Sequence, residues 1–487
     1  MSALQNRRSF LKQTGIGTAA AVAASNFALN TPVHAAGSDE IRIALVGCGG
    51  RGSGAVRDRA QVGDHYKITA VADAFEDSAK RGADSLRKDA AKEENPLAGK
   101  VDIADDSVFH GLDAYKKAMD CLKPGDQVIL ATPPGFRPFH YRYAVEKGLH
   151  VFMEKPVCID AAGFRHVMET NKTAEEKNLK ICVGFQVRLD VAPWIEQIHA
   201  GKIGTLLSTR IYYNAGRIWC RPREEGEEEL HFQIRNWYHF PYLCGENIAE
   251  QHCHTIDLAN QIHSKGDRMG HPVEANTMGG RTYKAAPEEL LRQAPPFSDR
   301  KEWDKWYQEH KSAFPRHGQA WDHFFTEYTY ADGSKVYSQC RHINNCWTHT
   351  LSEYVQGTSG SGTYLGYNPG KGKLVDSEGH EIWTKTGKLP KVSNQWEHDL
   401  HVKAIREDLP MHQGYAGAMS CMMAVLGREA GYSGKVIKWD DLVEKGRDYF
   451  PNGEITSWDS PAPVQPDADG FYENSVPVPG VYNPFAG

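Results

Sequence analysis

A glycine-rich segment that directly follows an apolar run is the first part of this chain with the residue types to bind a ligand. The letters GCGGRG, beginning at Gly47, fit the spacing G-x-G-x-x-G. In that spacing Gly47 allows a tight turn, Gly49 lets the backbone approach a pyrophosphate, and Gly52 lets a helix pack closely on a strand. A helix that begins near Gly50 and Arg51 directs its N-terminus at the phosphates. The segment therefore predicts a dinucleotide-binding loop.

A carboxylate follows at the distance that such a loop requires. Asp73 lies 26 residues after Gly47, at the end of the next apolar run. An acid at that place binds the ribose hydroxyls of the adenosine half and repels a 2′-phosphate. We therefore expect NAD as the cofactor. NADP is the alternative, because Arg51 could lie over the adenine or a phosphate.

Alternating strands and helices must hold these residues in place. Short apolar runs separated by helical segments indicate a parallel, doubly wound sheet, which is an α/β fold. The apolar runs begin at Ile41, Tyr66, Asp126, His150 and Lys180. We predict an NAD-binding Rossmann domain over residues 40–157.

The pattern changes after about residue 189, where strand-like alternation and an Asp-Gly turn at Asp332 indicate a largely antiparallel sheet. We predict a second α/β domain over 158–445. Polar, Pro-containing residues near 282–320 are expected to be an insertion. Residues 446–487, rich in Pro and Gly, are expected to be a C-terminal arm.

The N-terminal residues have the features of an export signal. Asn6–Lys12 reads NRRSFLK and resembles the twin-arginine motif, and a weakly apolar segment follows from Thr14 to Leu29. Val33 and Ala35 fit a cleavage site for small residues. We therefore predict that residues 1–35 are a twin-arginine signal peptide and that the protein is periplasmic or otherwise exported.

Composition argues against several classes of protein. The formal net charge is −6 and 24% of the residues are charged, which does not suit a nucleic-acid-binding protein. Beyond the N-terminus we expect no membrane span, because no apolar run approaches about 18 residues. The ten cysteines are spread singly, which argues against a zinc ribbon, although Cys244 with Cys253, or Cys340 with Cys346, could pair in an oxidising compartment.

Two further motifs, ATPP ending at Pro134 and MEKP ending at Pro156, complete the spacing of a known family. The chain resembles the glucose–fructose oxidoreductase and inositol dehydrogenase family (Gfo/Idh/MocA) over roughly residues 41–440. The resemblance implies a Rossmann domain followed by an α/β domain with a large open sheet, which often forms the dimer contact. A homo-oligomer, either a dimer or a tetramer, is therefore expected.

The resemblance also implies roles for residues at the nicotinamide half of the cofactor. Thr132 and Pro133 would line the cofactor, and Glu154 would lie near the nicotinamide ribose. Lys155 would lie near the same ribose and also face the substrate. A cation beside a hydroxyl stabilises the alkoxide that develops as hydride leaves.

The family usually carries an Asp-x-x-x-His pair, and the matching positions here are Glu250 and His254. On one helix these two residues would share a face. His254 could then act as the general base, while Glu for Asp leaves the role of Glu250 open. The two residues could instead share a metal ion, but we assign no metal, and we expect His252 between them to be structural.

Further candidates for binding the substrate are weaker, because Arg, Asn and aromatic side chains suit a sugar but also suit ordinary packing and ion pairs. They are Arg188, Asp190, Trp219, Arg235, Asn236 and Trp237. The acidic run Glu224–Glu229 reads as a solvated loop.

The export signal and the nucleotide loop constrain each other. Outside the cytoplasm there is no useful NAD pool, so an exported enzyme must fold around its cofactor and keep it. The net reaction must then be redox-neutral. We expect an exported NAD(P)-dependent oxidoreductase that acts on a sugar, polyol or glycoside. The alternatives are a redox-neutral glycosidase, like the NAD-dependent α-N-acetylgalactosaminidases, and a catalytically silent, NAD-containing sugar-binding protein.

Overall fold

We describe a computed structural model of the chain. It describes residues 40–486 except 222, 283–295, 297, 300, 303–304, 307–308, 310–317, 345–350, 368, 388–391, 451 and 469–471. The predicted signal peptide, Cys346 and most of the predicted insertion near 282–320 lie outside these residues.

The first sheet has six parallel strands in the order β3-β2-β1-β4-β5-β6. The strands are β1 (Ile41–Val46), β2 (Tyr66–Asp73), β3 (Val108–His110), β4 (Gln127–Leu130), β5 (His150–Met153) and β6 (Ile181–Val183). The strands are rich in branched apolar residues because helices cover both faces of the sheet, and every residue of β4 is buried. This strand order is that of a dinucleotide-binding Rossmann domain, which confirms the predicted fold class.

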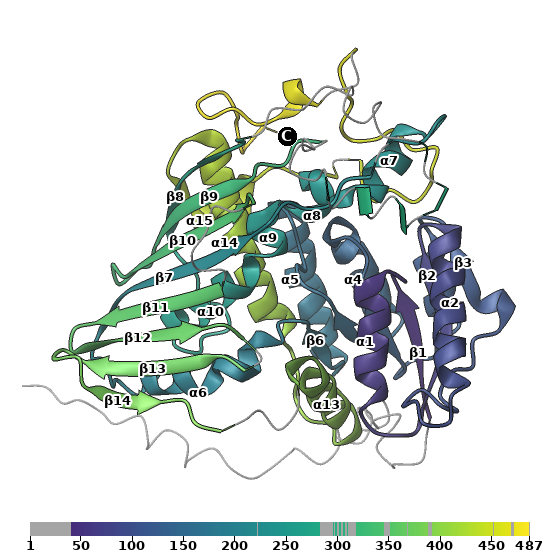
Figure 1. The fold of residues 1–487 in the computed structure, drawn as a ribbon, viewed down its shortest axis with the longest axis horizontal. Helices are drawn as coiled ribbons and strands as arrows, with labels where there is room; N and C mark the ends of the chain where they lie inside the picture. Colours follow the sequence, from purple (N-terminus) through teal and green to yellow (C-terminus); the bar gives the residue numbers. More distant parts are fainter. Residues whose placement is uncertain are drawn as a thin grey trace, which may run out of the picture.

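Helices from two distant parts of the chain cover this sheet (Figure 1). The N-terminal ones are α1 (Gly50–Ala60), α2 (Glu76–Ala90), α3 (Ala114–Asp120), α4 (Arg137–Glu146) and α5 (Ala161–Glu176). A late helix, α13 (Ser393–Arg406), packs against α1 and β6. Its residues Ala404 and Ile405, together with Met411 just beyond it, share one hydrophobic cluster with Ile41 and Ile43 of β1. The Rossmann core is therefore completed by residues far beyond the predicted boundary at 157.

The second sheet has nine strands in the order β14-β13-β12-β11-β7-β10-β9-β8-β15. They are β7 (Leu206–Ala215), β8 (Glu274–Gly280), β9 (His323–Thr329), β10 (Lys335–His342), β11 (Leu351–Gly357), β12 (Gly360–Leu365), β13 (Lys371–Asp376), β14 (Glu381–Thr384) and β15 (Ile437–Lys438). Its neighbouring strands are antiparallel except β7 and β10, which pair in parallel, so the sheet is mixed and mostly antiparallel. In β10, buried and half-buried side chains alternate, because only one face of the sheet is covered by helices.

The long helix α14 (Gly414–Ser433) joins the two halves of the molecule. All but one of its residues are buried, which is typical of a helix that is enclosed on every side. It packs on β8 and β9 of the large sheet and on α5 of the Rossmann domain. Further helices in the described part of the chain are α6 (Val187–His199), α7 (Glu229–Arg235), α8 (Pro241–Cys244), α9 (Asn247–Glu250), α10 (Cys253–Ser264) and α15 (Trp439–Lys445). In the part of the chain that the structure describes, none of the helices has both the length and the apolar character needed to span a lipid bilayer.

The C-terminal arm runs over the top of the molecule from the large sheet to α7 (Figure 1). The Gln233 side chain of α7 donates a hydrogen bond to the carbonyl of Val464, at 2.6 Å. Tyr472 packs edge-on against Phe240, with ring centroids 5.1 Å apart. The arm is therefore attached to the segment that lies above the Rossmann domain.

Candidate functional site

The glycines of the loop have two different structural roles. Gly47 has φ +98°, and a Cβ atom there would lie 2.6 Å from the carbonyl carbon of Ala131. A Cβ on Gly52 would lie 1.9 Å from the carbonyl oxygen of Gly47, so the strand and the helix touch at that point. A Cβ on Gly49 or Gly50 would meet no atom within 4 Å. The space beside Gly49 and Gly50 is therefore open at the N-terminus of α1, where a diphosphate would bind.

Asp73 is fixed at the carboxyl end of β2. Its Oδ2 atom accepts a hydrogen bond from the N–H of Cys48 at 2.8 Å, and its Oδ1 atom accepts one from the N–H of Phe75 at 3.0 Å. Burial raises the pKa of Asp73, and these two N–H groups oppose that rise. The carboxylate is thereby held next to the glycine loop, as a site for the ribose of NAD requires.

Thr132 and Pro133 line a small cavity that Asp73 also lines. The hydroxyl of Thr132 is 3.1 Å from Nδ1 of His140, and its carbonyl accepts a hydrogen bond from Arg137 at 2.6 Å. These bonds hold the segment after β4 against α4.

Arg51 points away from the adenosine side and towards the end of β5. Its Nε and Nη2 atoms lie 2.7 Å and 2.6 Å from Oε1 of Glu154. Nη2 also lies 3.6 Å from Oε1 of Glu397, and Nη1 lies 3.6 Å from Asp58. The arginine thus joins the glycine loop to the residues expected at the nicotinamide half, and its possible place over the adenine or a phosphate stays a prediction.

Lys155 and Glu250 form an ion pair between the two domains. The Nζ atom of Lys155 is 3.1 Å from Oε1 of Glu250 and also donates to the Glu250 carbonyl. Burial disfavours the charged amine, but Glu250, Cys253 and Glu154 together outweigh burial and raise the pKa of Lys155. Lys155 therefore stays a cation in a buried position.

Glu250 and His254 do not share one helix, so that part of the prediction is wrong. α9 ends at Glu250, and α10 begins at Cys253. The turn forms because the buried His252 between them bonds to Ser338 at 2.6 Å and to Thr255 at 2.8 Å. His252 is therefore structural, as expected. Among the described residues, no three His, Cys, Asp or Glu side chains come together as a metal site.

His254 is buried beside the Lys155 pair. Its Nδ1 atom is enclosed and has no hydrogen-bond partner. Burial, followed by the positive charges of Lys155, Arg51 and Arg188, lowers the pKa of His254 well below 6.5. The imidazole is therefore neutral, with a nitrogen free to accept a proton.

The structure commits Arg188 and Asp190 to other protein groups. Nε of Arg188 donates to Asp257 at 2.7 Å, and its guanidinium lies 4.7 Å from the centre of the Phe185 ring. Asp190 is fully buried, pairs with Lys385, and accepts a bond from the N–H of Gly370 at 2.7 Å. Arg188 is close enough to affect the pKa of His254, whereas Asp190 faces the second sheet.

The four remaining candidates lie around the end of α7. Arg235 binds Glu227 at 2.6 Å and Glu224 at 3.0 Å, and Glu227 is only 2% exposed. The acidic run is therefore not simply solvated, because its members neutralise Arg235. Asn236 is fully buried and bonds to both backbone groups of Arg221. The rings of Trp219 and Trp237 are half-buried and meet edge-on, with centroids 6.4 Å apart.

Two further side chains in this region were not expected from the sequence. Burial and the negative charge of Glu250 raise the pKa of Tyr238. Glu397 of α13 lies near Arg51. No local motif marks either residue, because each reaches the site from a segment far from the glycine loop.

The cysteines Cys244 and Cys253, which the sequence allowed to pair, are both free thiols, and Cys340 is also a free thiol.

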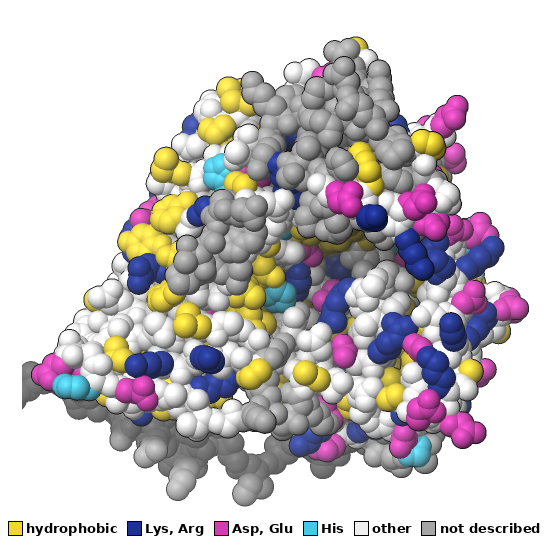
Figure 2. Space-filling view, in the orientation of Figure 1, with side chains coloured by type: hydrophobic (Ala, Val, Ile, Leu, Met, Phe, Trp, Pro, Cys, Tyr) yellow, Lys and Arg dark blue, Asp and Glu magenta, His cyan; other side chains and the backbone are white. Residues whose placement is uncertain are grey.

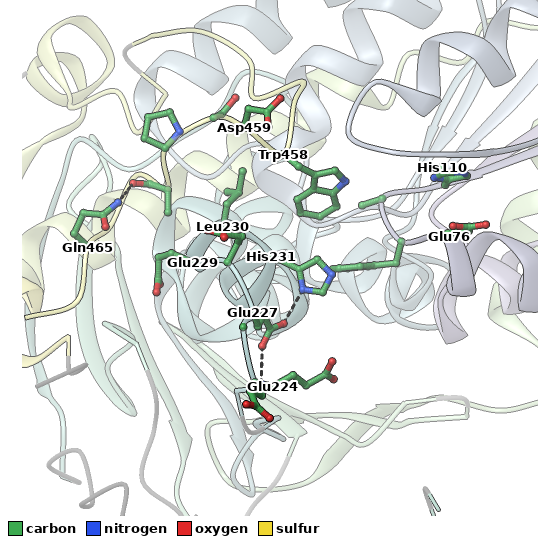
Figure 3. A pocket seen from close by; sticks show the side chains of 18 residues that line it. Glu76, His110, Glu224, Glu227, Glu229, Leu230, His231, Trp458, Asp459 and Gln465 are labelled. Atoms are coloured by element: carbon green, nitrogen blue, oxygen red, sulfur yellow. Dashed lines mark hydrogen bonds and ion pairs between the residues drawn. The ribbon is translucent and has the colours of Figure 1, made fainter.

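A cavity of about 960 Å³ adjoins the end of β2 (Figure 3). It is lined by Phe75 and His110 of the Rossmann domain, by His231 of α7 and by Trp458 of the arm. The ring centroids of His231 lie 4.8 Å from Phe75 and 5.3 Å from Trp458. Aromatic side chains from three segments thus meet beside the expected adenosine site.

Figure 2 shows a hollow between the two halves of the molecule, with basic, acidic and histidine side chains at its margin.

Comparison with known proteins agrees with this geometry. Residues 41–185 match the model of the Gfo/Idh/MocA family, an oxidoreductase family with an NAD-binding Rossmann fold. The solved structure of a levoglucosan dehydrogenase in complex with NADH and levoglucosan is similar with a TM-score of 0.57 and 15% identity, covering 82% of this chain and 99% of that chain. Such a likeness establishes the fold.

Two curated proteins are similar over part of the chain. Glycosyl hydrolase family 109 protein 1 of Akkermansia muciniphila is 28% identical over 172 residues, which are 35% of this chain and 32% of the relative. A glycosyl hydrolase family 109 protein of Streptomyces coelicolor is 30% identical over 201 residues, which are 40% of each chain. The chain therefore matches less than half the length of either relative.

Proposed function

We propose that this chain, whose residues 41–185 form an NAD-binding domain of the Gfo/Idh/MocA oxidoreductase family, is an exported enzyme that oxidises a hydroxyl group of a sugar, polyol or glycoside. The observation that carries the proposal is that Lys155, just after β5, and His254 lie close together where the nicotinamide is expected. A buried cation and a buried neutral base with a free nitrogen there suit removal of hydride from an alcohol.

Each residue then has a defined chemical role. NAD, when bound, supplies the acceptor for the hydride. The neutral imidazole of His254 accepts the hydroxyl proton, and Lys155 stabilises the negative charge that develops on the same oxygen. Glu250 keeps Lys155 charged and fixes the position of its amine. The open space at Gly49 and Gly50 fits the diphosphate.

Export through the twin-arginine pathway would require that the cofactor stays bound. Retention through large dilution needs roughly nanomolar affinity, about −12 kcal/mol. The C-terminal arm supports retention, because it lies on α7 beside the expected adenosine site. The net reaction would then return the cofactor to its starting redox state.

The test is to purify the mature protein without added nucleotide, denature it and identify what is released. About one equivalent of NAD(H) per chain supports a cofactor that stays bound through the catalytic cycle. A protein that releases no nucleotide and binds NAD weakly would contradict retention of the cofactor. The remaining hypotheses would then be a conventional dehydrogenase and a binding protein without activity.

A redox-neutral glycosidase is the second candidate, and the two glycosyl hydrolase family 109 relatives favour it. Oxidation of one sugar carbon acidifies the neighbouring proton, elimination breaks the glycosidic bond, and water addition and reduction complete the cycle. Incubation with glycosides in deuterated water distinguishes the two, because only elimination incorporates deuterium at that neighbouring carbon.

The low pKa of His254 predicts an unusual pH profile. A lowered histidine pKa keeps the base neutral down to that pKa, so activity is lost only below it. We expect kcat/KM to stay constant from pH 8 down to at least 6.5, the ordinary histidine value, and to fall on the acid side. The measurement is the pH–rate profile of the purified enzyme. A half-maximal rate near 6.5 would show that His254 is not buried during the reaction or is not the base.

Removing the Trp458 ring is expected to weaken retention of the cofactor. Its contacts with Phe75 and His231 are worth about 1 kcal/mol, so Trp458→Ala should speed the loss of bound NAD about fivefold. The rate is measured by diluting the loaded protein into a nucleotide trap. Val481→Ala is the matched control, since Val481 lies on the same arm and is 80% exposed. Equal rates for the two variants would exclude the arm from retention.

A further inference from the structure

Glu397 presents a buried carboxyl group that the fold itself does not use. Its side chain is 5% exposed, and neither of its oxygens has a hydrogen-bond partner. Burying a carboxyl group without a partner is unfavourable, so its presence calls for an explanation. α13 packs against α1 and brings this group to within 3.6 Å of the Arg51 guanidinium.

Arg51 lies between two acids and bonds to only one of them. Its Nη2 atom is 2.6 Å from Oε1 of Glu154, and its Nε atom is 2.7 Å from the same oxygen. The Glu397 distance of 3.6 Å is too long for a hydrogen bond. Glu154 is the residue expected at the nicotinamide ribose, and while Arg51 holds its Oε1 atom only Oε2 remains to accept a hydrogen bond from a ribose hydroxyl.

We infer that Glu397 is a cofactor-positioning residue, which takes over Arg51 when NAD binds and so releases Glu154 for the ribose. The inference rests on the proposed function only in that the loop binds NAD. The Arg51 nitrogen must move about 1 Å to reach hydrogen-bond distance from Glu397. Both partners are charged and paired in the bound state, so neither charge is left alone in the interior.

The exchange moves a proton. Burial, and then the negative charge of Glu154, raise the pKa of Glu397 well above 4.5 in the structure as it stands. A direct bond to Arg51 favours the carboxylate, so the proton passes to solvent as the bond forms. The charged or titratable groups that face Glu397 are Arg51 and Asp58 of α1, Glu154 after β5, Cys182 of β6 and Arg188 of α6.

Proton release links NAD affinity to pH. Binding that releases one proton tightens about tenfold for each unit of rising pH, and the dependence ends once Glu397 is already ionised in the free protein. A residue that only stabilises the fold would not produce this dependence.

The experiment is titration calorimetry of the full chain, freed of nucleotide, with NAD alone as the ligand. Comparing two buffers of different ionisation enthalpy gives the number of protons released. We expect close to one proton for the wild type and none for Glu397→Gln, with NAD bound about tenfold more weakly by the variant. Glu397→Asp should restore part of the release. Glu407→Gln, at the exposed end of the same helix, is the control and should behave as the wild type.

Proton release that is the same in Glu397→Gln, or absent from the wild type, overturns the inference. If Glu397→Gln does not fold, difference infrared spectroscopy of the wild type with and without NAD decides: loss of a protonated-carboxyl band supports the exchange, and an unchanged band contradicts it. Absence of sugar turnover would leave these readings intact, because both use NAD alone.

Discussion

Replacing Lys155 with methionine is expected to lower turnover about a thousandfold while NAD stays bound. Lys155 is the buried cation that Glu250 holds in place, and methionine keeps its apolar length without the charge. The hydride can then leave only from an oxygen whose negative charge has no counterion. Single-turnover reduction of the bound cofactor, followed by absorbance of the reduced nicotinamide, measures the loss directly.

Two controls separate chemistry from folding. Lys403→Met, on the exposed side of α13, should leave turnover unchanged. Glu250→Gln should keep Lys155 in place by hydrogen bonding but lower its pKa, so that the loss of turnover is smaller and grows towards high pH. Wild-type rates in Lys155→Met would remove Lys155 from the mechanism, whatever the cofactor content.

Alanine substitutions at Gly52 and Gly49 should weaken NAD binding for different reasons. Gly52→Ala places a methyl group 1.9 Å from the Gly47 carbonyl, which the strand and helix cannot accommodate without separating. We expect it to destabilise the fold by about 3 kcal/mol and to abolish NAD binding. Gly49→Ala meets no protein atom within 4 Å, and its φ of −66° suits alanine. It should fold as stably as the wild type, yet bind NAD about a hundredfold more weakly, because the methyl group occupies the diphosphate's space.

Thermal melting without nucleotide, followed by NAD titration, tests the pair. The decisive comparison is Gly49→Ala, because its effect on binding cannot be attributed to unfolding if its melting temperature matches the wild type. Normal NAD affinity in that variant would place the diphosphate elsewhere.

The Rossmann sheet and its loop could be predicted because their signals are local. Each strand is a short apolar run, and the glycines are required within a single turn. The break between α9 and α10 could not be predicted in this way. It depends on the bond from His252 to Ser338, which lies on β10 in the other domain.

Contacts between distant segments also decide which of the predicted site residues are bound to other protein groups. Asp190 is neutralised by Lys385, and Asn236 is satisfied by the Arg221 backbone. Residue type alone suggested a sugar site at both positions, but only the tertiary structure shows what satisfies each group. For Glu397 the opposite holds. Its position in the sequence looks like an ordinary helical one, but in the structure neither oxygen of its buried carboxyl group has a hydrogen-bond partner.

The return of α13 to the first domain has a consequence for biosynthesis. A ribosome delivers β1 and its glycine loop early, but Ala404, Ile405 and Met411 of the same hydrophobic cluster emerge only after more than three quarters of the chain has been made. The nucleotide domain therefore cannot finish folding during synthesis of its own strands. A nascent chain would therefore acquire its cofactor only after translation has passed Met411.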